Sequence, residues 1–361
     1  MIFVAYAFLI ALIVAVLVTP LARRLSIRTG MMDRPHGRKR HRLATPLLGG
    51  LALFVSFGAT IGLGLALWPG LSEGPVADTP LNWESLGYMV LGGGLLMCLT
   101  GLLDDVLDLG PVWKLVLHTL AALLVGAYFL VQGAQVRLFL EGSWTLLAAP
   151  LTIFWLVLMT NSLNLLDHAD GLAAGIAAIA SGFLAVSNVL VANYAVAFIA
   201  AAITGSCLGF LVYNRNPASI FMGDSGSNLL GFMLGMIAVL GVYTPMGGIR
   251  ELAVLTPLLI LAVPLVDTAM VLLYRWKRGE PLLRGDRNHL AHRLMRIGFS
   301  HLAAVNMLYV IGVMMGTLAM LLPTLKPYQA VLVFIHAAAV VGVMSYFIHK
   351  AEAVRGGDER A

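Results

Sequence analysis

Charge is scarce in this 361-residue sequence, because only 11% of its residues are Asp, Glu, Lys or Arg and 60% are apolar. An ordinary soluble domain is about 25% charged and about 45–50% apolar. The 23 basic and 18 acidic residues gather in a few short stretches, so they cannot cover a water-facing surface. This composition excludes a soluble globular enzyme and predicts a polytopic membrane protein.

Cysteine and long polar blocks are also scarce. The two cysteines, Cys98 and Cys207, both lie in apolar segments, so the sequence contains no readable disulfide framework. The longest charged stretches have about 25 residues, which is too short for a separate soluble domain. We expect one transmembrane catalytic domain over 1–348 and a short cytoplasmic tail at 349–361.

Long apolar runs, in contrast, are abundant. A helix needs about 20 apolar residues to cross the hydrocarbon core, where every backbone polar group must be satisfied internally. Eleven stretches qualify, and ten spans also fit because the fifth stretch is short and the sixth and seventh nearly touch. The expected spans of this all-α bundle are 2–20, 47–68, 86–103, 112–132, 145–160, 172–192, 194–213, 227–245, 252–274, 302–322 and 328–348.

The basic residues predict the direction of these spans. Cytoplasmic loops carry the excess of Lys and Arg, and twenty of the 23 follow odd-numbered spans. The other face holds only Arg137, Arg250 and Lys326. We therefore expect the N-terminus outside the cell and the C-terminus in the cytoplasm.

Most acids, amides and histidines outside the spans fall on the same predicted cytoplasmic face. The loops concerned are 21–46, 104–111, 161–171, 214–226 and 275–300. The outer loops carry few acids and no histidine. We expect one face to hold a site and the other to be mainly connection.

The run Asp104, Asp105 and Asp108 ends the third span. Three carboxylates within five residues repel one another unless a cation lies among them, so the run favours hard-cation or phosphate-metal chemistry. A simple solvated helix end is the alternative.

The next polar run follows the fifth span. Asn161, Asn164, Asp167 and Asp170 stand three residues apart, and this spacing aligns them on one helical face. Their oxygens could bind a hard cation, a nucleotide or a sugar, whereas the alternative is a helix cap followed by a loop. For His168 the sequence favours a local hydrogen bond.

Asp224 stands in a glycine-rich turn before the eighth span. Gly223 and Gly226 allow the backbone to approach a ligand closely, while Ser225 or Ser227 can cap the helix. The amides of this turn would favour an anion, although a purely structural turn explains the pattern equally well.

Two loops are basic. The first contains Arg38, Lys39 and His41, and can serve as a topology determinant, an anionic-lipid contact or a substrate site. The second contains His289, His292 and Arg293, a mixture that suits a phosphate-rich ligand.

Asp267 lies inside the ninth predicted span, about 12 Å from its cytoplasmic edge at 1.5 Å per residue. An ionisable residue at such a depth indicates either a functional site or a hydrogen bond to a neighbouring helix.

Together these runs resemble the polyprenyl-phosphate N-acetylhexosamine-1-phosphate transferases, the membrane enzymes of glycosyltransferase family 4 that include the bacterial undecaprenyl-phosphate GlcNAc-1-phosphate transferases. Five motifs stand in the family's order, with Lys114 at a further family position. They are Asp33-x-Pro35-x-x-Arg38-Lys39-Arg40-His41, Asp104-Asp105-x-x-Asp108, Asn161-x-x-Asn164-x-x-Asp167 with Asp170-Gly171, Gly223-Asp224-Ser225-Gly226-Ser227, and His289-x-x-His292-Arg293. Two positions differ from the usual motifs, which have Gly where His168 stands and His where Ala291 stands.

The resemblance implies transfer of an N-acetylhexosamine 1-phosphate from a UDP-sugar to polyprenyl phosphate, with release of UMP, at the cytoplasmic face of the bacterial inner membrane. It implies Mg²⁺, or Mn²⁺ in its place, on Asp224 and Asn164, with Asp104 and Asp105 orienting or deprotonating the lipid phosphate. The remaining polar positions would bind substrate, namely Lys114, Asn161, Asp167, Asp170, His289, His292, Arg293, Arg38, Lys39 and His41. No nucleic acid is expected as a partner, and a homodimer stays open.

Two other classes of membrane protein explain part of this pattern. An intramembrane Mg²⁺-dependent prenyltransferase would explain the Asp-rich loops but not the loops of Asp224 and His289. A transporter would place ionisable groups near the bilayer midplane, whereas nearly every acid here lies in a loop.

Overall fold

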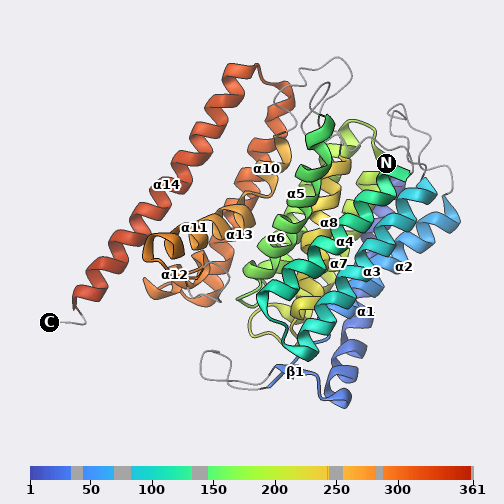
Figure 1. Ribbon diagram of the computed structural model, residues 1–361, viewed down its shortest axis with the longest axis horizontal. Coiled ribbons are helices and arrows are strands. Elements are labelled where there is room, and N and C mark those ends of the chain that lie inside the picture. The colour runs from blue at the N-terminus through green and yellow to red at the C-terminus, as the bar shows by residue number, and fades with distance from the viewer. Residues whose placement is uncertain are drawn as a thin grey trace. The chain divides into compact units, whose positions relative to one another are not determined.

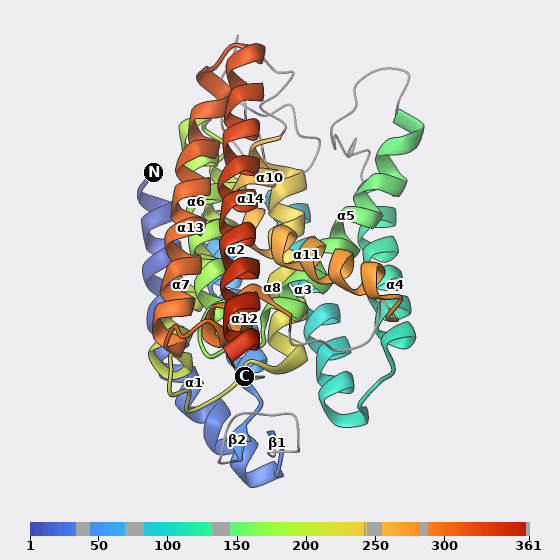
Figure 2. The same ribbon diagram turned by 90° about the vertical axis from the view of Figure 1, so that its left-hand side faces the viewer.

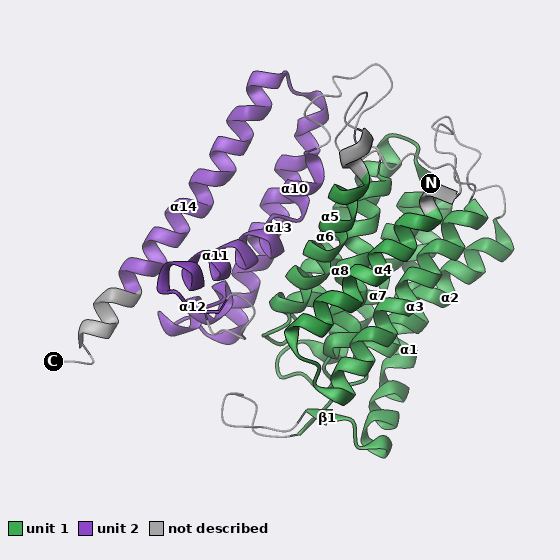
Figure 3. Ribbon diagram, in the orientation of Figure 1, with its two compact units in different colours: residues 1–242 green, residues 243–361 purple. Residues whose placement is uncertain are grey.

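The computed structural model describes residues 1–33, 44–68, 83–131, 145–241, 243, 255–281 and 288–358. The chain divides into two compact units, residues 1–242 and 243–361, which are coloured separately in Figure 3. The single domain expected over 1–348 stays a prediction.

The first unit is a bundle of long helices with one short strand pair (Figure 1). Its helices are α1 (Ile2–Thr29), α2 (Gly49–Leu67), α3 (Trp83–Leu107), α4 (Pro111–Val131), α5 (Thr145–Leu166), α6 (Leu172–Leu190), α7 (Tyr194–Asn214) and α8 (Gly223–Leu240). Strands β1 (Met32–Asp33) and β2 (Thr45–Pro46) pair antiparallel between α1 and α2. The predicted all-α class is confirmed.

Glycines allow α8 to lie close to three neighbouring helices. A methyl group on Gly50 of α2 would overlap the backbone N of Gly226, and one on Gly101 of α3 would overlap the backbone of Asp224. A methyl group on Gly231 of α8 itself would come within 2.6 Å of the Met159 carbonyl oxygen in α5. Small residues at such contacts let helix backbones approach closely, which fixes the start of α8 against α2 and α3.

The second unit contains two long helices and several short ones. They are α10 (Thr256–Ile260), α11 (Ala262–Arg278), α12 (Leu290–Arg296), α13 (His301–Leu321), the 3-10 turn η2 (Leu322–Thr324) and α14 (Pro327–Asp358). Figures 1 and 2 both show α11 running across the direction of α13 and α14.

The predicted ninth span, 252–274, is interrupted in the structure. Among its described residues, helix α10 stops at Ile260 and α11 begins at Ala262. Pro264 explains the break, because proline has no N–H for the carbonyl of Ile260 and its ring collides with that carbonyl in a continuous helix. The other ten predicted spans correspond to the ten described helices that are long and apolar enough to cross a membrane.

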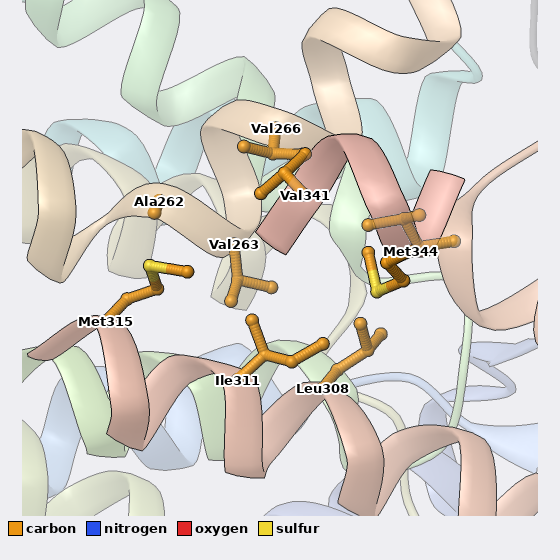
Figure 4. A pocket seen from close by; sticks show the side chains of 9 residues that line it. Ala262, Val263, Val266, Leu308, Ile311, Met315, Val341 and Met344 are labelled. Atoms are coloured by element: carbon orange, nitrogen blue, oxygen red, sulfur yellow. The ribbon is translucent and has the colours of Figure 1, made fainter. Parts of the chain in front are cut away.

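A small apolar pocket lies inside the second unit (Figure 4). Its lining comes from α11, α12, α13 and α14 and contains no ionisable side chain: Ala262, Val263, Val266, Leu290, Leu308, Ile311, Met315, Val341 and Met344. The Leu290 side chain thus anchors the first turn of α12 among apolar neighbours.

The polar loops of the first unit meet at one end of its bundle. The backbone N–H groups of Gly49 and Gly50, at the start of α2, donate to the carbonyls of Phe221 and Met222 just before α8, at 2.9 and 2.8 Å. The end of α3 and the starts of α4 and α8 are joined there by ion pairs of Lys114. Grouping the loops by span parity therefore predicted correctly which loops share a face of this unit.

Candidate active site

One lysine joins two acids from different helices. Lys114 Nζ, in the first turn of α4, lies 2.7 Å from Asp224 Oδ2 and also pairs with Asp104 Oδ2. Asp104 is buried, whereas the side chains of Lys114 and Asp224 are 28% and 30% exposed. A single ammonium group therefore bridges carboxylates of α3 and α8, and part of Asp224 stays accessible from outside.

Asp105 fixes the start of α8. Its Oδ1 accepts a hydrogen bond from the Asp224 N–H at 2.9 Å, and its Oδ2 accepts one from the Ser225 N–H at 3.2 Å. A carboxylate at this place satisfies free N–H groups and interacts favourably with the helix dipole. Gly223 adjoins it with φ +66°, and a methyl group there would come within 2.6 Å of Asp105 Oδ2. Asp105 thus positions Asp224, while its expected role toward a lipid phosphate stays a prediction.

Two amide side chains near the end of α5 lie beside Asp224 and helix α4. Asn164 Nδ2 donates to Asp224 Oδ1 at 2.9 Å and to Ser227 Oγ at 3.0 Å. Asn161 Nδ2 lies 3.3 Å from Nδ1 of His118, a buried residue of α4. The structure therefore brings Asn164 to Asp224 and places Asn161 beside the neighbouring helix.

Asp170 ties two loops together. Its Oδ2 accepts hydrogen bonds from Asn216 Nδ2 at 2.8 Å and from the Ala218 N–H at 3.1 Å. The buried Asn214 adds a second link, because its Oδ1 accepts from the Gly171 N–H at 3.2 Å. These bonds hold the loop before α6 against the loop before α8, and substrate binding by Asp170 stays a prediction.

Asp167 is half-buried beside the acids of the cluster. Burial, followed by the negative charges of Asp224, Asp105 and Asp170, raises the pKa of Asp167 to about 8. At neutral pH its carboxyl group is therefore mainly protonated and can donate a hydrogen bond.

We expect the Asp167→Asn variant to lose less thermal stability than the wild type as the pH rises from about 4 to about 8 in metal-free detergent solution. The unfolded pKa of Asp is about 3.9, so the folded wild type holds its extra proton more tightly and loses stability as the pH rises from about 4 to about 8. Asparagine does not titrate. Thermal unfolding followed by tryptophan fluorescence measures the difference, and equal pH dependence in both proteins would contradict it.

The predicted histidines of the last motif lie in the second unit. His289 is the N-cap residue of α12 and is buried, as is Arg293. The ring of His292 lies with its centroid 6.4 Å from that of His289. Asp267 Oδ2 lies 2.7 Å from His289 Nδ1, so Asp267 forms the hydrogen bond to another helix that was one of its two predicted roles. The meeting of His289 with Asp224 stays a prediction.

Arg38, Lys39 and His41, which were predicted to bind substrate, fall outside the described residues.

His118 was not predicted, although the sequence held a signal for it. It stands four residues after Lys114, and this spacing places both on one face of α4. His168, in contrast, was predicted correctly, because its Nδ1 lies 3.1 Å from the Leu165 carbonyl oxygen in a local hydrogen bond.

Comparison with known proteins gives a consistent result. A sequence profile of glycosyl transferase family 4 matches residues 88–242. A probable undecaprenyl-phosphate N-acetylglucosaminyl 1-phosphate transferase of Bacillus subtilis is 32% identical over 328 residues, which cover 89% of this chain and 86% of that protein. A decaprenyl-phosphate N-acetylglucosaminephosphotransferase of Mycolicibacterium smegmatis is 33% identical over 83% of this chain and 77% of its own length.

A more distant relative is the undecaprenyl-phosphate alpha-N-acetylglucosaminyl 1-phosphate transferase of Escherichia coli K12, with 27% identity over 83% of this chain and 78% of that protein. The similarity covers most of each chain, and the profile match contains the cluster around Asp104, Lys114 and Asp224. The chain therefore belongs to glycosyl transferase family 4, as a multi-pass membrane enzyme similar to the polyprenyl-phosphate N-acetylglucosamine-1-phosphate transferases.

Proposed function

We propose that this enzyme transfers N-acetylglucosamine 1-phosphate from UDP-N-acetylglucosamine to a polyprenyl phosphate, and so begins the synthesis of a cell-envelope polymer. The observation that carries the proposal is the ion-paired cluster of Asp104, Lys114 and Asp224 at the loop end of an apolar helix bundle. The relatives named above act on undecaprenyl or decaprenyl phosphate, which supports the lipid acceptor.

In this reaction an oxygen of the polyprenyl phosphate forms a bond to the sugar-bearing phosphorus of the nucleotide sugar. The bond from that phosphorus to the bridging oxygen breaks, and UMP leaves with the electron pair. The products are polyprenyl-diphosphate-sugar and UMP, so no oxidant or water is consumed. Two anions must meet, and the positive charge of Lys114 lowers their repulsion in a site that also positions them.

A divalent cation fits the donor set. Asp224 offers partly exposed carboxylate oxygens, and Asn164 has an amide oxygen in the same cluster. Such oxygen ligands suit Mg²⁺, with Mn²⁺ as a substitute. When bound, the ion would neutralise charge on phosphate oxygens.

The other polar residues have distinct proposed roles. Asp104 and Asp105 would orient or deprotonate the lipid phosphate. The donor would be contacted by Asn161, Asp167 and Asp170. His289, His292 and Arg293 would bind the diphosphate and the sugar.

The proposed location is the inner membrane of a bacterium, with the cluster facing the cytoplasm. One substrate is a long hydrocarbon confined to the bilayer and the other is a soluble nucleotide, so the reacting groups must meet at the boundary. The excess of Lys and Arg in the loops on this side supports the orientation.

The test is an assay of purified enzyme in detergent with undecaprenyl phosphate, radiolabelled UDP-N-acetylglucosamine and Mg²⁺. We expect one UMP released for each labelled lipid formed, and mass spectrometry should identify the lipid as a diphosphate-linked sugar. No UMP from the nucleotide sugar, together with inorganic diphosphate released in a parallel assay supplied with an isoprenoid diphosphate, would replace the proposal with prenyl transfer.

A further inference from the structure

Asp267 bonds to two groups at the start of α12. Its Oδ2 lies 2.7 Å from His289 Nδ1, and its Oδ1 accepts a hydrogen bond from the Leu290 N–H, also at 2.7 Å. Asp267 is 1% exposed and His289 is 3% exposed. The two carboxylate oxygens thus fix both the ring of the N-cap residue and the first backbone N–H of the helix.

The contact with Asp267 bears on which ring nitrogen of His289 carries the proton. With Asp267 ionised, its carboxylate only accepts hydrogen bonds, so Nδ1 of His289 is the donor in this contact. In the neutral ring, Nε2 then keeps its lone pair, and in the charged ring it is a second donor. The same pairing of a carboxylate with a functional imidazole fixes tautomer and ring orientation in other enzymes.

The hydrogen bond from the Leu290 N–H to Asp267 also fixes the position of the first turn of α12. A carboxylate at the N-terminus of a helix satisfies a free N–H group, and the Leu290 side chain is buried and is one of those that line the apolar pocket of this unit. His292 and Arg293 stand two and three residues further along the same helix. The direction of all three side chains of the last motif therefore depends on the start of α12.

We propose that Asp267 is a positioning residue, which holds His289 with Nδ1 protonated so that Nε2 is presented to a phosphate oxygen of the nucleotide sugar. Asp267 itself touches no substrate and acts through His289. The proposal rests on the proposed function for the identity of the ligand, whereas the bond between Asp267 and His289 is independent of it.

The principal variant is Asp267→Asn, which keeps the size of the side chain and removes its charge. An asparagine amide group can donate to Nδ1 of His289 and so moves the ring proton to Nε2. We expect kcat/KM for UDP-N-acetylglucosamine to fall about 10- to 100-fold, the range seen when such supporting partners are removed. The KM for undecaprenyl phosphate should stay unchanged.

A double-mutant cycle separates positioning from general structural support. If Asp267 acts through His289, the double variant Asp267→Asn/His289→Ala should be no slower than His289→Ala alone. Fully additive losses would overturn the proposal. Thr268→Val is the matched control, since Thr268 is the adjacent buried residue of α11, and this variant should keep the wild-type rate within about twofold.

Nuclear magnetic resonance of ¹⁵N-histidine-labelled protein at about pH 9 tests the tautomer directly, with His289→Ala assigning the signal. We expect His289 to be protonated at Nδ1 in the wild type and at Nε2 in Asp267→Asn. An Nε2-protonated wild-type ring would overturn the proposal whether or not the enzyme transfers sugar phosphate. A wild type that shows the Nδ1 tautomer but releases no UMP would contradict the proposed function alone.

Discussion

The Asp224→Asn variant is expected to lose sugar-phosphate transfer by about a thousandfold or more, while its amount in the membrane stays close to that of the wild type. Asp224 receives hydrogen bonds from Lys114 and from Asn164, and its side chain is 30% exposed. Asparagine has the same shape but lacks the negative charge that would bind a divalent cation and pair with Lys114. The measurement is UMP release at saturating substrates, with protein in the membrane quantified by immunoblot.

Glu84→Gln is the control for this prediction. It removes a carboxylate from an exposed position near the start of α3, whereas Asp104 and Asp105 lie near the end of the same helix. We expect it to keep wild-type activity within about threefold, as most surface substitutions do. If Asp224→Asn retained a tenth of wild-type activity, Asp224 would not belong to the reacting centre.

The second large effect is expected from Gly101→Ala, although Gly101 is not a polar residue. A methyl group at this position of α3 would overlap the backbone of Asp224 and Ser225, and a backbone cannot turn aside as a side chain can. Helices α3 and α8 must therefore separate, at a cost of about 1–3 kcal/mol in the free energy of unfolding. A displacement of about 1 Å at Asp224 would slow transfer by about a hundredfold.

Gly92→Ala provides a matched control on the same helix. A methyl group at Gly92 would meet no atom within 4 Å, so the substitution adds only the better helix propensity of alanine. We expect the Gly92→Ala variant to show wild-type transfer and an equal or higher unfolding temperature. Equal behaviour of the two variants would show that the close contact between α3 and α8 does not control the site.

Much of this architecture could be predicted because lipid imposes a simple rule on sequence. Each apolar run of about 20 residues must become a helix, and the order of the runs then assigns every loop to a face. For that reason Asp104, Asn164 and Asp224, which are far apart in the sequence, could be expected on one side, and the contacts within the first unit confirm it.

Other features depend on contacts that no local pattern encodes. Asp105 was grouped with Asp104 because the two are adjacent, yet its carboxylate receives backbone N–H groups of α8, which a sequence pattern alone does not indicate. Pro264 in the sequence indicates a helix break near Leu261. The break was not predicted because the residues on both sides of it are apolar and read as one continuous span. The pairing of Asp267 with His289 joins two helices across 22 residues of sequence, and no local pattern relates the two positions.

The position of Lys114 bears on how the enzyme would behave without the divalent cation proposed above. Since one ammonium group already lies between Asp104 and Asp224, an internal counterion limits the repulsion of these acids when chelators remove the divalent cation. The bundle should keep its shape through such a cycle, and adding the ion back should restore turnover without refolding. Lys114 would thus remain as a built-in positive charge between the two acids, to which the proposed cation would be added.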